Sequence, residues 1–151
     1  MTVKTVDRSL LLAYTPAQMF ALVNDVARYP QFLPWCAAAR IVEQDAAHVL
    51  AAIDVRRGPL HLSFTTRNEL DTDRSIRMQL VDGPFRELSG AWTFADVGGK
   101  GVRVTLRLQY DFRAAATRLL LEPAFDAVCR SIVNAFARRA REVHGRGDQA
   151  G

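Results

Sequence analysis

The chain has 151 residues, of which 49% are hydrophobic, and this suits a single domain with one continuous core, expected at residues 1–145. The net charge of +4 permits attraction to phosphate or anionic lipid but says nothing about the fold. The apolar run at residues 10–13 is too short for a signal sequence or a membrane span, so we expect a soluble, cytoplasmic protein. Cys36 and Cys129 lie far apart without a CxxC motif, which argues against a zinc site or a disulfide framework.

The N-terminal part predicts a strand followed by a short helix. Residues 3–12 are rich in β-formers and partly alternate. Thr15 can cap a helix while Pro16 takes its first position, and Gln18 completes a capping box three residues after the cap. Apolar residues then recur at helical spacing, and the helix should end near Asn24–Asp25.

From residue 37 the hydrophobic period changes to two, and recurring turn signals predict about six antiparallel strands. The last strand, residues 102–112, is the clearest, because its apolar residues alternate strictly with polar ones. This alternation places Asp111 on the wet face. The run Gly98–Gly101 joins two strands and is best interpreted as a hairpin turn.

After Arg113 the period returns to 3.6 and predicts a helix of 20 residues or more, with Pro123 either beginning its main segment or kinking it. A strongly twisted sheet curls, and only this helix is long enough to cover its apolar face. We therefore expect an α+β, helix-grip fold: a curved antiparallel sheet of about seven strands wrapped around a long C-terminal helix, with two short helices after the first strand. Residues 146–151 should form a disordered tail.

The sequence offers little for catalysis or metal binding. His48, His61 and His144 lack the spacing of a metal site, and neither a nucleophile elbow nor a phosphate-binding loop is present. We therefore predict no catalytic residue, no metal site and no required cofactor. Asp111, His61 and Glu87 are the only acid or base candidates near the predicted inner face.

Aromatic and apolar side chains populate every element that should face the final helix. Ordinary close packing explains them as well as an apolar cavity does. Gly90, on the inner face beside Trp92, either makes room for a ligand or marks a bulge or bend in its strand. The segment Tyr29–Trp35 places apolar residues between two prolines, and it is either a plug on the end of the sheet or a mobile lid.

Two stretches resemble a known family. Residues 15–26 with 28–36, which include Tyr29-Pro30-Gln31-Phe32-Leu33-Pro34-Trp35-Cys36, resemble the signature of the coenzyme-Q-binding, RatA-type family within the START-like superfamily. Residues 82–85 and 88–94 resemble its second motif, and the similarity extends over roughly residues 3–144. The resemblance implies a hydrophobic tunnel between sheet and C-terminal helix.

The resemblance also implies two functions. One is binding of ubiquinone or a similar polyisoprenoid or lipid, with transient membrane contact. The other is RatA-type binding of the large ribosomal subunit, which blocks subunit association. A third, oligoketide cyclase activity, is a minor alternative, and we expect no DNA partner. The predicted wall and lid of the tunnel comprise Phe20, Tyr29, Phe32, Leu33, Trp35, Phe64, Met78, Phe85, Trp92, Phe94, Tyr110, Phe125, Ile132 and Phe136. The predicted RNA-docking residues are Arg118, Arg130, Arg138, Arg139 and Arg141.

Overall fold

The computed structural model describes residues 2–145, so the predicted tail at 146–151 lies outside the described residues. In chain order the elements are β1 (Lys4–Leu12), α1 (Pro16–Asn24), the 3₁₀ helix η1 (Val26–Gln31), β2 (Cys36–Gln44), β3 (His48–Arg57), β4 (Leu60–Asp71), β5 (Ser75–Asp82), β6 (Phe85–Asp96), β7 (Val102–Phe112) and α2 (Ala115–His144).

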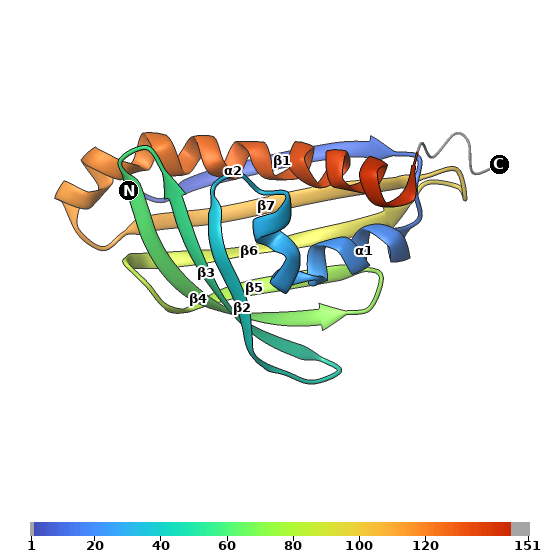
Figure 1. The fold of residues 1–151 in the computed structure, drawn as a ribbon, viewed down its shortest axis with the longest axis horizontal. Coiled ribbons are helices and arrows are strands. Elements are labelled where there is room, and N and C mark those ends of the chain that lie inside the picture. The colour runs from blue at the N-terminus through green and yellow to red at the C-terminus, as the bar shows by residue number, and fades with distance from the viewer. Residues whose placement is uncertain (1, 146–151) are drawn as a thin grey trace.

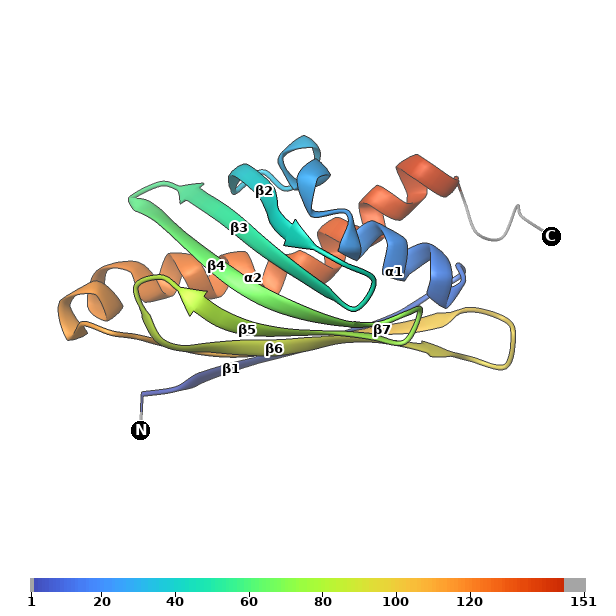
Figure 2. The same ribbon diagram turned by 90° about the horizontal axis from the view of Figure 1, so that it is seen from below.

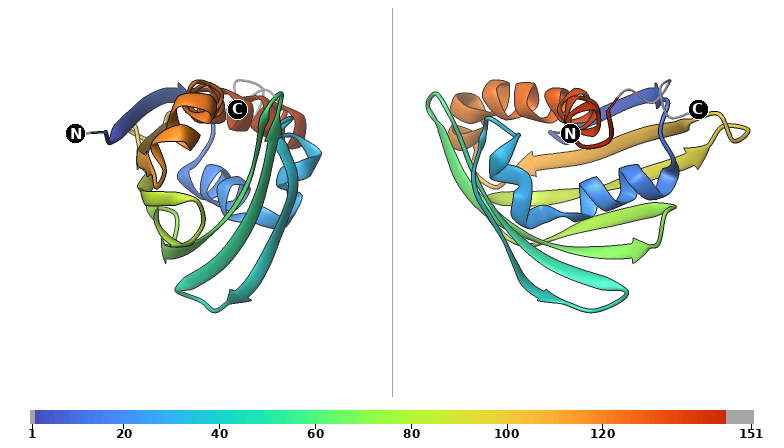
Figure 3. Two further views of the ribbon diagram at one scale, coloured as in Figure 1. Left: turned by 90° about the vertical axis from the view of Figure 1, so that its left-hand side faces the viewer. Right: turned by 45° about the vertical axis from the view of Figure 1, so that its right-hand side comes forward.

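The strands form one antiparallel sheet in the order β1-β7-β6-β5-β4-β3-β2, a meander to which β1 is added at the β7 edge. The sheet curls, and α2 lies along its concave side (Figures 1 and 2). Viewed from the end, the sheet forms a trough with α2 across the opening and α1 and η1 alongside (Figure 3). The predicted helix-grip fold, with seven strands and two short helices after the first, is confirmed.

The capping box predicted at the start of α1 is present. The Thr15 hydroxyl accepts from the Gln18 backbone N–H at 3.1 Å, and the Gln18 side-chain oxygen accepts from the Thr15 N–H at 2.9 Å. The helix ends at Asn24, as predicted. Its apolar side packs near β6, where Phe20 meets Phe94 at a ring-centroid distance of 5.9 Å.

The long helix α2 has 30 residues and begins at Ala115. The alternative in which Pro123 begins its main segment is therefore wrong, because Pro123 lies inside the helix. Residues 115–122 are mostly strong helix formers, and these extend the helix on the N-terminal side of the proline. At the other end Gly145 terminates the helix with a φ of 72°, a conformation that glycine adopts at low cost.

The core fills the space between the concave face of the sheet and the helices. The largest fully buried side chains include Tyr110, Phe85, Phe112, Phe136 and Met19. No helix within the described residues is both long enough and apolar enough to cross a membrane.

Candidate ligand-binding site

An apolar cavity of about 100 Å³ lies in the interior between the sheet and α2. Its lining comprises Val26, Tyr29, Leu33, Trp35, Ala51, Ile53, Val55, Phe64, Thr66, Asn68, Met78, Leu88, Ser89, Trp92, Leu106, Leu108, Phe125, Val128, Cys129, Ile132 and Phe136. The strands β3 to β7, the segment around η1 and the middle of α2 therefore all contribute to the lining of one cavity.

Alternation along β3 supplies one wall. Ala51, Ile53 and Val55 point inward and are nearly completely buried. Across from them, Phe125, Val128, Ile132 and Phe136 repeat at helical spacing along α2. Ala51 is the smallest side chain of these facing rows, and its short side chain leaves space that a larger residue would occupy.

Two buried polar features stand in this apolar lining. The Thr66 hydroxyl donates to the Asn68 side-chain oxygen at 2.8 Å, and both residues are buried. The Trp35 Nε1–H is buried and has no hydrogen-bond partner among the described residues. Buried polar groups that are unpaired destabilise a protein, so they are rare and usually have a functional or structural reason.

Nine of the fourteen predicted wall and lid residues line the cavity. They are Tyr29, Leu33, Trp35, Phe64, Met78, Trp92, Phe125, Ile132 and Phe136. The structure brings these residues together from η1, the following loop, β4, β5, β6 and α2.

The other five predicted residues lie elsewhere in the core. Phe85 and Tyr110 belong to an aromatic cluster with Phe112 and Phe125, in which the Phe85 and Phe112 rings stack at 4.9 Å. Both rings contact Phe125, which lines the cavity, and neither Phe85 nor Tyr110 belongs to the lining itself.

Phe20, Phe94 and Phe32 are also absent from the lining. Phe20 of α1 and Phe94 of β6 pack against each other where the helix meets the sheet. The Phe32 ring meets the Phe136 ring at a centroid distance of 5.2 Å, and the Arg139 guanidinium lies over the Phe32 ring at 4.9 Å.

Several lining residues were not predicted. Ala51, Ile53 and Val55 follow the alternation of β3, so that pattern could have identified them. Thr66 and Asn68 carry no such signal, because polar residues in a strand normally predict the exposed face.

The structure contradicts the interpretation that Gly90 makes room for a ligand. A Cβ atom at this position would lie 2.5 Å from both the Leu108 Cδ2 and the Arg107 carbonyl oxygen. The Leu108 side chain and the backbone of β7 thus occupy the space where a side chain of residue 90 would lie.

Three residues of the segment Tyr29–Trp35, namely Tyr29, Leu33 and Trp35, form part of the cavity wall. The Tyr29 hydroxyl donates to the Val23 carbonyl, and its ring meets Phe136 at 5.5 Å. Leu33 and Trp35 are 1% and 7% exposed. Burial raises the pKa of Tyr29 far above its usual range, so this phenol stays neutral and its hydrogen bond persists at physiological pH.

Both thiols are buried and protonated. Burial raises the pKa of Cys36 to about 11, and it raises that of Cys129 further still. Cys129 lines the cavity. A neutral thiol behaves as a small hydrophobic group, so it adds to the apolar character of the wall.

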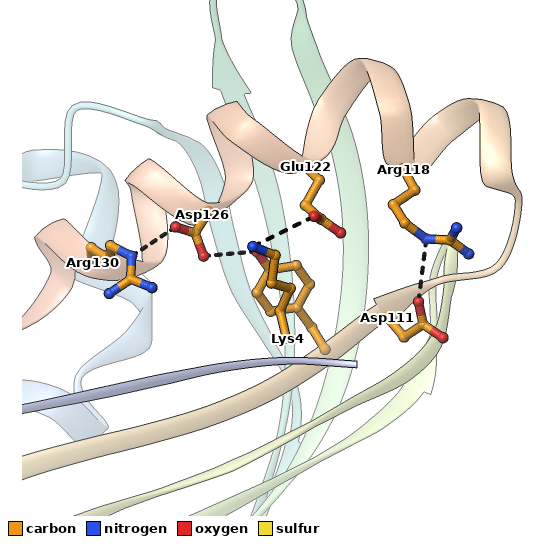
Figure 4. Close-up of polar contacts among 7 residues, drawn as sticks. Lys4, Asp111, Arg118, Glu122, Asp126 and Arg130 are labelled. Atoms are coloured by element: carbon orange, nitrogen blue, oxygen red, sulfur yellow. Dashed lines mark hydrogen bonds and ion pairs between the residues drawn. The ribbon is translucent and has the colours of Figure 1, made fainter. Parts of the chain in front are cut away.

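A polar cluster ties the first half of α2 to β1 and β7 (Figure 4). Arg118 Nε lies 3.5 Å from an Asp111 oxygen, and Lys4 Nζ lies 3.8 Å from a Glu122 oxygen. Asp111 is 1% exposed, so the prediction that it lies on the wet face is wrong. Alternation along β7 does turn it away from the core, but Thr2, Arg86 and Arg118 cover it there.

Asp126 extends this cluster. It accepts a hydrogen bond from the Tyr110 hydroxyl at 3.0 Å and from Arg130 Nε at 2.7 Å. Desolvation alone would raise the pKa of Asp126, but the two hydrogen bonds outweigh it and hold the pKa below its usual value. Asp126 is therefore charged at neutral pH, and none of Lys4, Asp111, Arg118, Glu122 and Asp126 belongs to the cavity lining.

The five predicted RNA-docking arginines fall into different settings. Arg118 and Arg130 are engaged with Asp111 and Asp126. Arg139 donates to the Gln31 side chain and lies over Phe32. Arg138 and Arg141 are exposed near the end of α2 and form no ion pair within residues 2–145.

The candidate acids and bases for a cyclase do not converge on the cavity. Asp111 is held in the polar cluster, His61 lies beside Asp54 with 58% of its side chain exposed, and Glu87 is absent from the lining. Within the described residues no group of three or more metal-binding side chains is assembled.

A curled seven-stranded sheet gripping a long C-terminal helix, with an apolar cavity between them, defines a START-like protein. The sequence model of the "Polyketide cyclase / dehydrase and lipid transport" family matches residues 12–137, and the chain belongs to this family. The resemblance stated from sequence is thereby confirmed.

Relatives within and around this family carry different names. The chain is 44% identical to "Ribosome association toxin RatA" of Vibrio cholerae, over 94% of this chain and 99% of that protein. It is 26% identical to "Coenzyme Q-binding protein COQ10, mitochondrial" of Dictyostelium discoideum, over 95% of this chain and 73% of that one. The crystal structure of the Zhui aromatase/cyclase of a Streptomyces species superposes with a TM-score of 0.82 at 20% identity, over 93% of this chain and 96% of that one, which shows a shared fold.

Proposed function

We propose that this protein is a non-enzymatic binder of a hydrophobic ligand, a ubiquinone or a similar polyisoprenoid or lipid, held between the sheet and α2. The observation that carries the proposal is the apolar cavity of about 100 Å³ in an otherwise closely packed core. Close packing normally leaves few voids larger than a water molecule, so an apolar cavity of this size offers space for part of an apolar ligand.

The volume constrains how the ligand binds. A cavity of about 150 Å³ in another protein accepts one benzene molecule, so the present space suits one ring or a short piece of chain. A longer ligand requires the Tyr29–Trp35 segment to move and act as a lid. Burial of the apolar tail stabilises the complex by about 25 cal/mol per Å². The Trp35 Nε1–H and the Thr66–Asn68 pair offer hydrogen bonds to a polar head group.

The absence of catalysis is part of this proposal. Its support is that neither Asp111, His61 nor Glu87 lines the cavity. A positioned acid or base is what cyclase chemistry would require there.

The test is to identify the ligand. The purified protein is extracted with organic solvent, and the extract is examined by mass spectrometry. The stripped protein is then loaded with a short-chain ubiquinone. We expect a co-purified quinone or long-chain lipid, or stoichiometric loading of the stripped protein. A protein that neither carries nor accepts such a molecule contradicts the proposal.

A second candidate is association with the large ribosomal subunit. It is favoured by the 44% identity to the ribosome association toxin over almost the full length of both chains. The exposed Arg138 and Arg141 are the best placed of the predicted docking residues, because within residues 2–145 neither side chain forms an ion pair, a hydrogen bond or a contact with an aromatic ring, whereas Arg139 is engaged by Gln31 and Phe32. Ligand binding inside and docking outside use different faces of α2, so the two functions are compatible.

Co-sedimentation with purified large subunits tests this second candidate. Binding should be present at low salt and should weaken steeply as salt is raised. The double variant Arg138→Gln/Arg141→Gln should bind more weakly than the wild type, whereas Arg130→Gln, already engaged with Asp126, should change binding little. No co-sedimentation at low salt would exclude it.

A further inference from the structure

The cavity lining is free of charge. Within residues 2–145 none of the side chains that line it belongs to an aspartate, glutamate, lysine, arginine or histidine. An ionised head group that enters such a space loses its hydration and meets no opposite charge, which is costly. A ligand that fits this cavity therefore carries a neutral head group.

Thr66 and Asn68 are the polar pair of this lining, and they lie on the inner face of β4. They are two residues apart, so both side chains point to the same face of the strand. Their register partners on the neighbouring strands β3 and β5 are all apolar: Ala51, Leu80, Val49 and Met78. The adjacent strands therefore offer the pair no oxygen or nitrogen side-chain partner.

The Thr66 hydroxyl fixes the orientation of the Asn68 amide. It donates to the Asn68 Oδ1 at 2.8 Å, and this is the only hydrogen bond of the Asn68 side chain within residues 2–145. Because Oδ1 is the acceptor of the amide, the end that stays free is Nδ2, with its two N–H donors. Asn68 is 6% exposed and lines the cavity, so the accessible part of its side chain faces the cavity space.

The other polar side chains of the lining add donors but no strong acceptor. The Trp35 Nε1–H is buried without a partner among the described residues. The Tyr29 hydroxyl is engaged by the Val23 carbonyl. Ser89 follows the inward-facing Leu88, so alternation turns the serine side chain to the outer face of β6. Two residues of the lining thus carry N–H donors for a ligand, whereas neither a carboxylate nor a free amide oxygen stands there to accept a proton.

We propose that the Asn68 amide donates to a carbonyl oxygen of the ligand, so that the cavity takes a neutral, carbonyl-bearing apolar molecule in preference to an alcohol or a carboxylate of the same length. An alcohol oxygen accepts the same hydrogen bond, but its own proton then has no carboxylate or free amide oxygen to bind. The inference rests on the proposed function and names the class of ligand that the site selects. For a quinone it assigns the oxidised form, whose ring oxygens are carbonyls, over the quinol, whose ring oxygens are hydroxyls.

Titration calorimetry of the full chain with 2-octanone, 2-octanol and octanoate at neutral pH tests the inference. The three probes share one carbon skeleton length, so the apolar surface that they bury is matched. We expect the ketone to bind about tenfold more tightly than the alcohol, because a buried hydroxyl with an unpaired proton is costly. Octanoate should bind at least about a hundredfold more weakly than the ketone, because it is ionised.

Two variants on β4 assign the preference to the polar pair. Asn68→Leu keeps a similar side-chain volume and removes the donors, so it should bind the ketone about fivefold to tenfold more weakly and no longer prefer it to the alcohol. Thr66→Val removes the hydroxyl that orients the amide, so the preference should fall. Thr65→Val is the matched control, because Thr65 faces the opposite side of β4 and lies outside the cavity lining. It should bind all three probes like the wild type, and circular dichroism should show all variants folded.

Equal affinities of the wild type for ketone and alcohol overturn the inference, as does a preference that Asn68→Leu retains. Tighter binding of the alcohol also overturns it, because the amide would then present its oxygen to the cavity.

A second titration, with short-chain ubiquinone and with its quinol under anaerobic conditions, separates this inference from the proposed function. We expect the quinone to bind about tenfold more tightly than the quinol. Equal binding of the two forms overturns the inference and leaves the proposed function intact. Binding of neither form, and of none of the octane derivatives, contradicts the proposed function and the inference with it.

Discussion

At Gly90 the strand β7 leaves no room for a side chain on β6. A methyl group there would lie 2.5 Å from a backbone oxygen of β7, and backbone cannot yield as a flexible side chain can. Gly90→Ala should therefore destabilise the protein by about 1–3 kcal/mol, although alanine usually suits a strand better than glycine. Chemical denaturation measures the change. Ala91→Ser, on the neighbouring outward position, should change stability by less than about 0.5 kcal/mol. Equal stability of Gly90→Ala and the wild type would contradict the close approach.

Ionisation of the Cys36 thiol makes the free energy of unfolding depend on pH in the alkaline range. Burial raises its folded pKa from 9.0 to about 11, so folding favours the neutral thiol. The contribution of Cys36 to the free energy of unfolding is fully present below pH 9.0 and is lost as the pH rises towards 11. The measurement is the free energy of unfolding of the wild type and of Cys36→Ala across this window. The free energy of unfolding of the wild type should fall relative to that of Cys36→Ala as the pH rises. A difference that stays constant across this window would contradict the raised pKa.

Single residues also show what the sequence could not provide. The Thr15 capping box was predictable because its partners are three residues apart. The burial of Asp111 was not, because Thr2 lies 109 positions away along the chain and the Arg118 side chain reaches it from another element. The filling of the Gly90 position by Leu108 likewise depends on the register between β6 and β7.

At the scale of elements, α2 is held by two different kinds of contact. Phe125, Val128 and Phe136 pack it against the interior, and the polar cluster fixes its first half to β1 and β7. Hydrophobic periodicity predicted the first kind of contact and the length of the helix beyond 20 residues. Periodicity did not predict that the helix starts at Ala115, because a proline near the beginning of a helix is usually read as its start.

Asp111→Ala tests how much the polar cluster stabilises this half of α2. The substitution leaves Arg118, whose side chain is only 23% exposed, without its acid partner. It should lower the free energy of unfolding by about 2–3 kcal/mol. Asp7→Ala, at an exposed position of β1 without an ion pair in the described residues, should cost less than about 0.5 kcal/mol. Hydrogen exchange should show faster opening of residues 115–122 in Asp111→Ala, and unchanged exchange there would contradict the role assigned to the cluster.

At the scale of the whole molecule, the hydrophobic pattern predicted the architecture to the number of strands, whereas the cavity was expected only from the family resemblance. The change of the hydrophobic period from two to 3.6 determines which face of the sheet meets which face of the helix. It does not determine how completely side chains fill the space between them. Ala51 is the smallest of the three β3 side chains that line the cavity. Nine of the predicted wall residues nonetheless lie around it, because they face inward from the elements that the pattern identified.

The central claim is that this cavity binds an apolar ligand, and a fluorescence titration with a short-chain ubiquinone tests it most directly. Trp35 and Trp92, the two tryptophans of the chain, both line the cavity, so bound quinone should quench their emission. We predict saturable quenching at one ligand per chain. Ala51→Leu should reduce it strongly by filling the space, whereas Ala52→Leu, on the opposite face of β3, should leave it unchanged. Quenching that never saturates, or that is equal in the two leucine variants, would contradict the account.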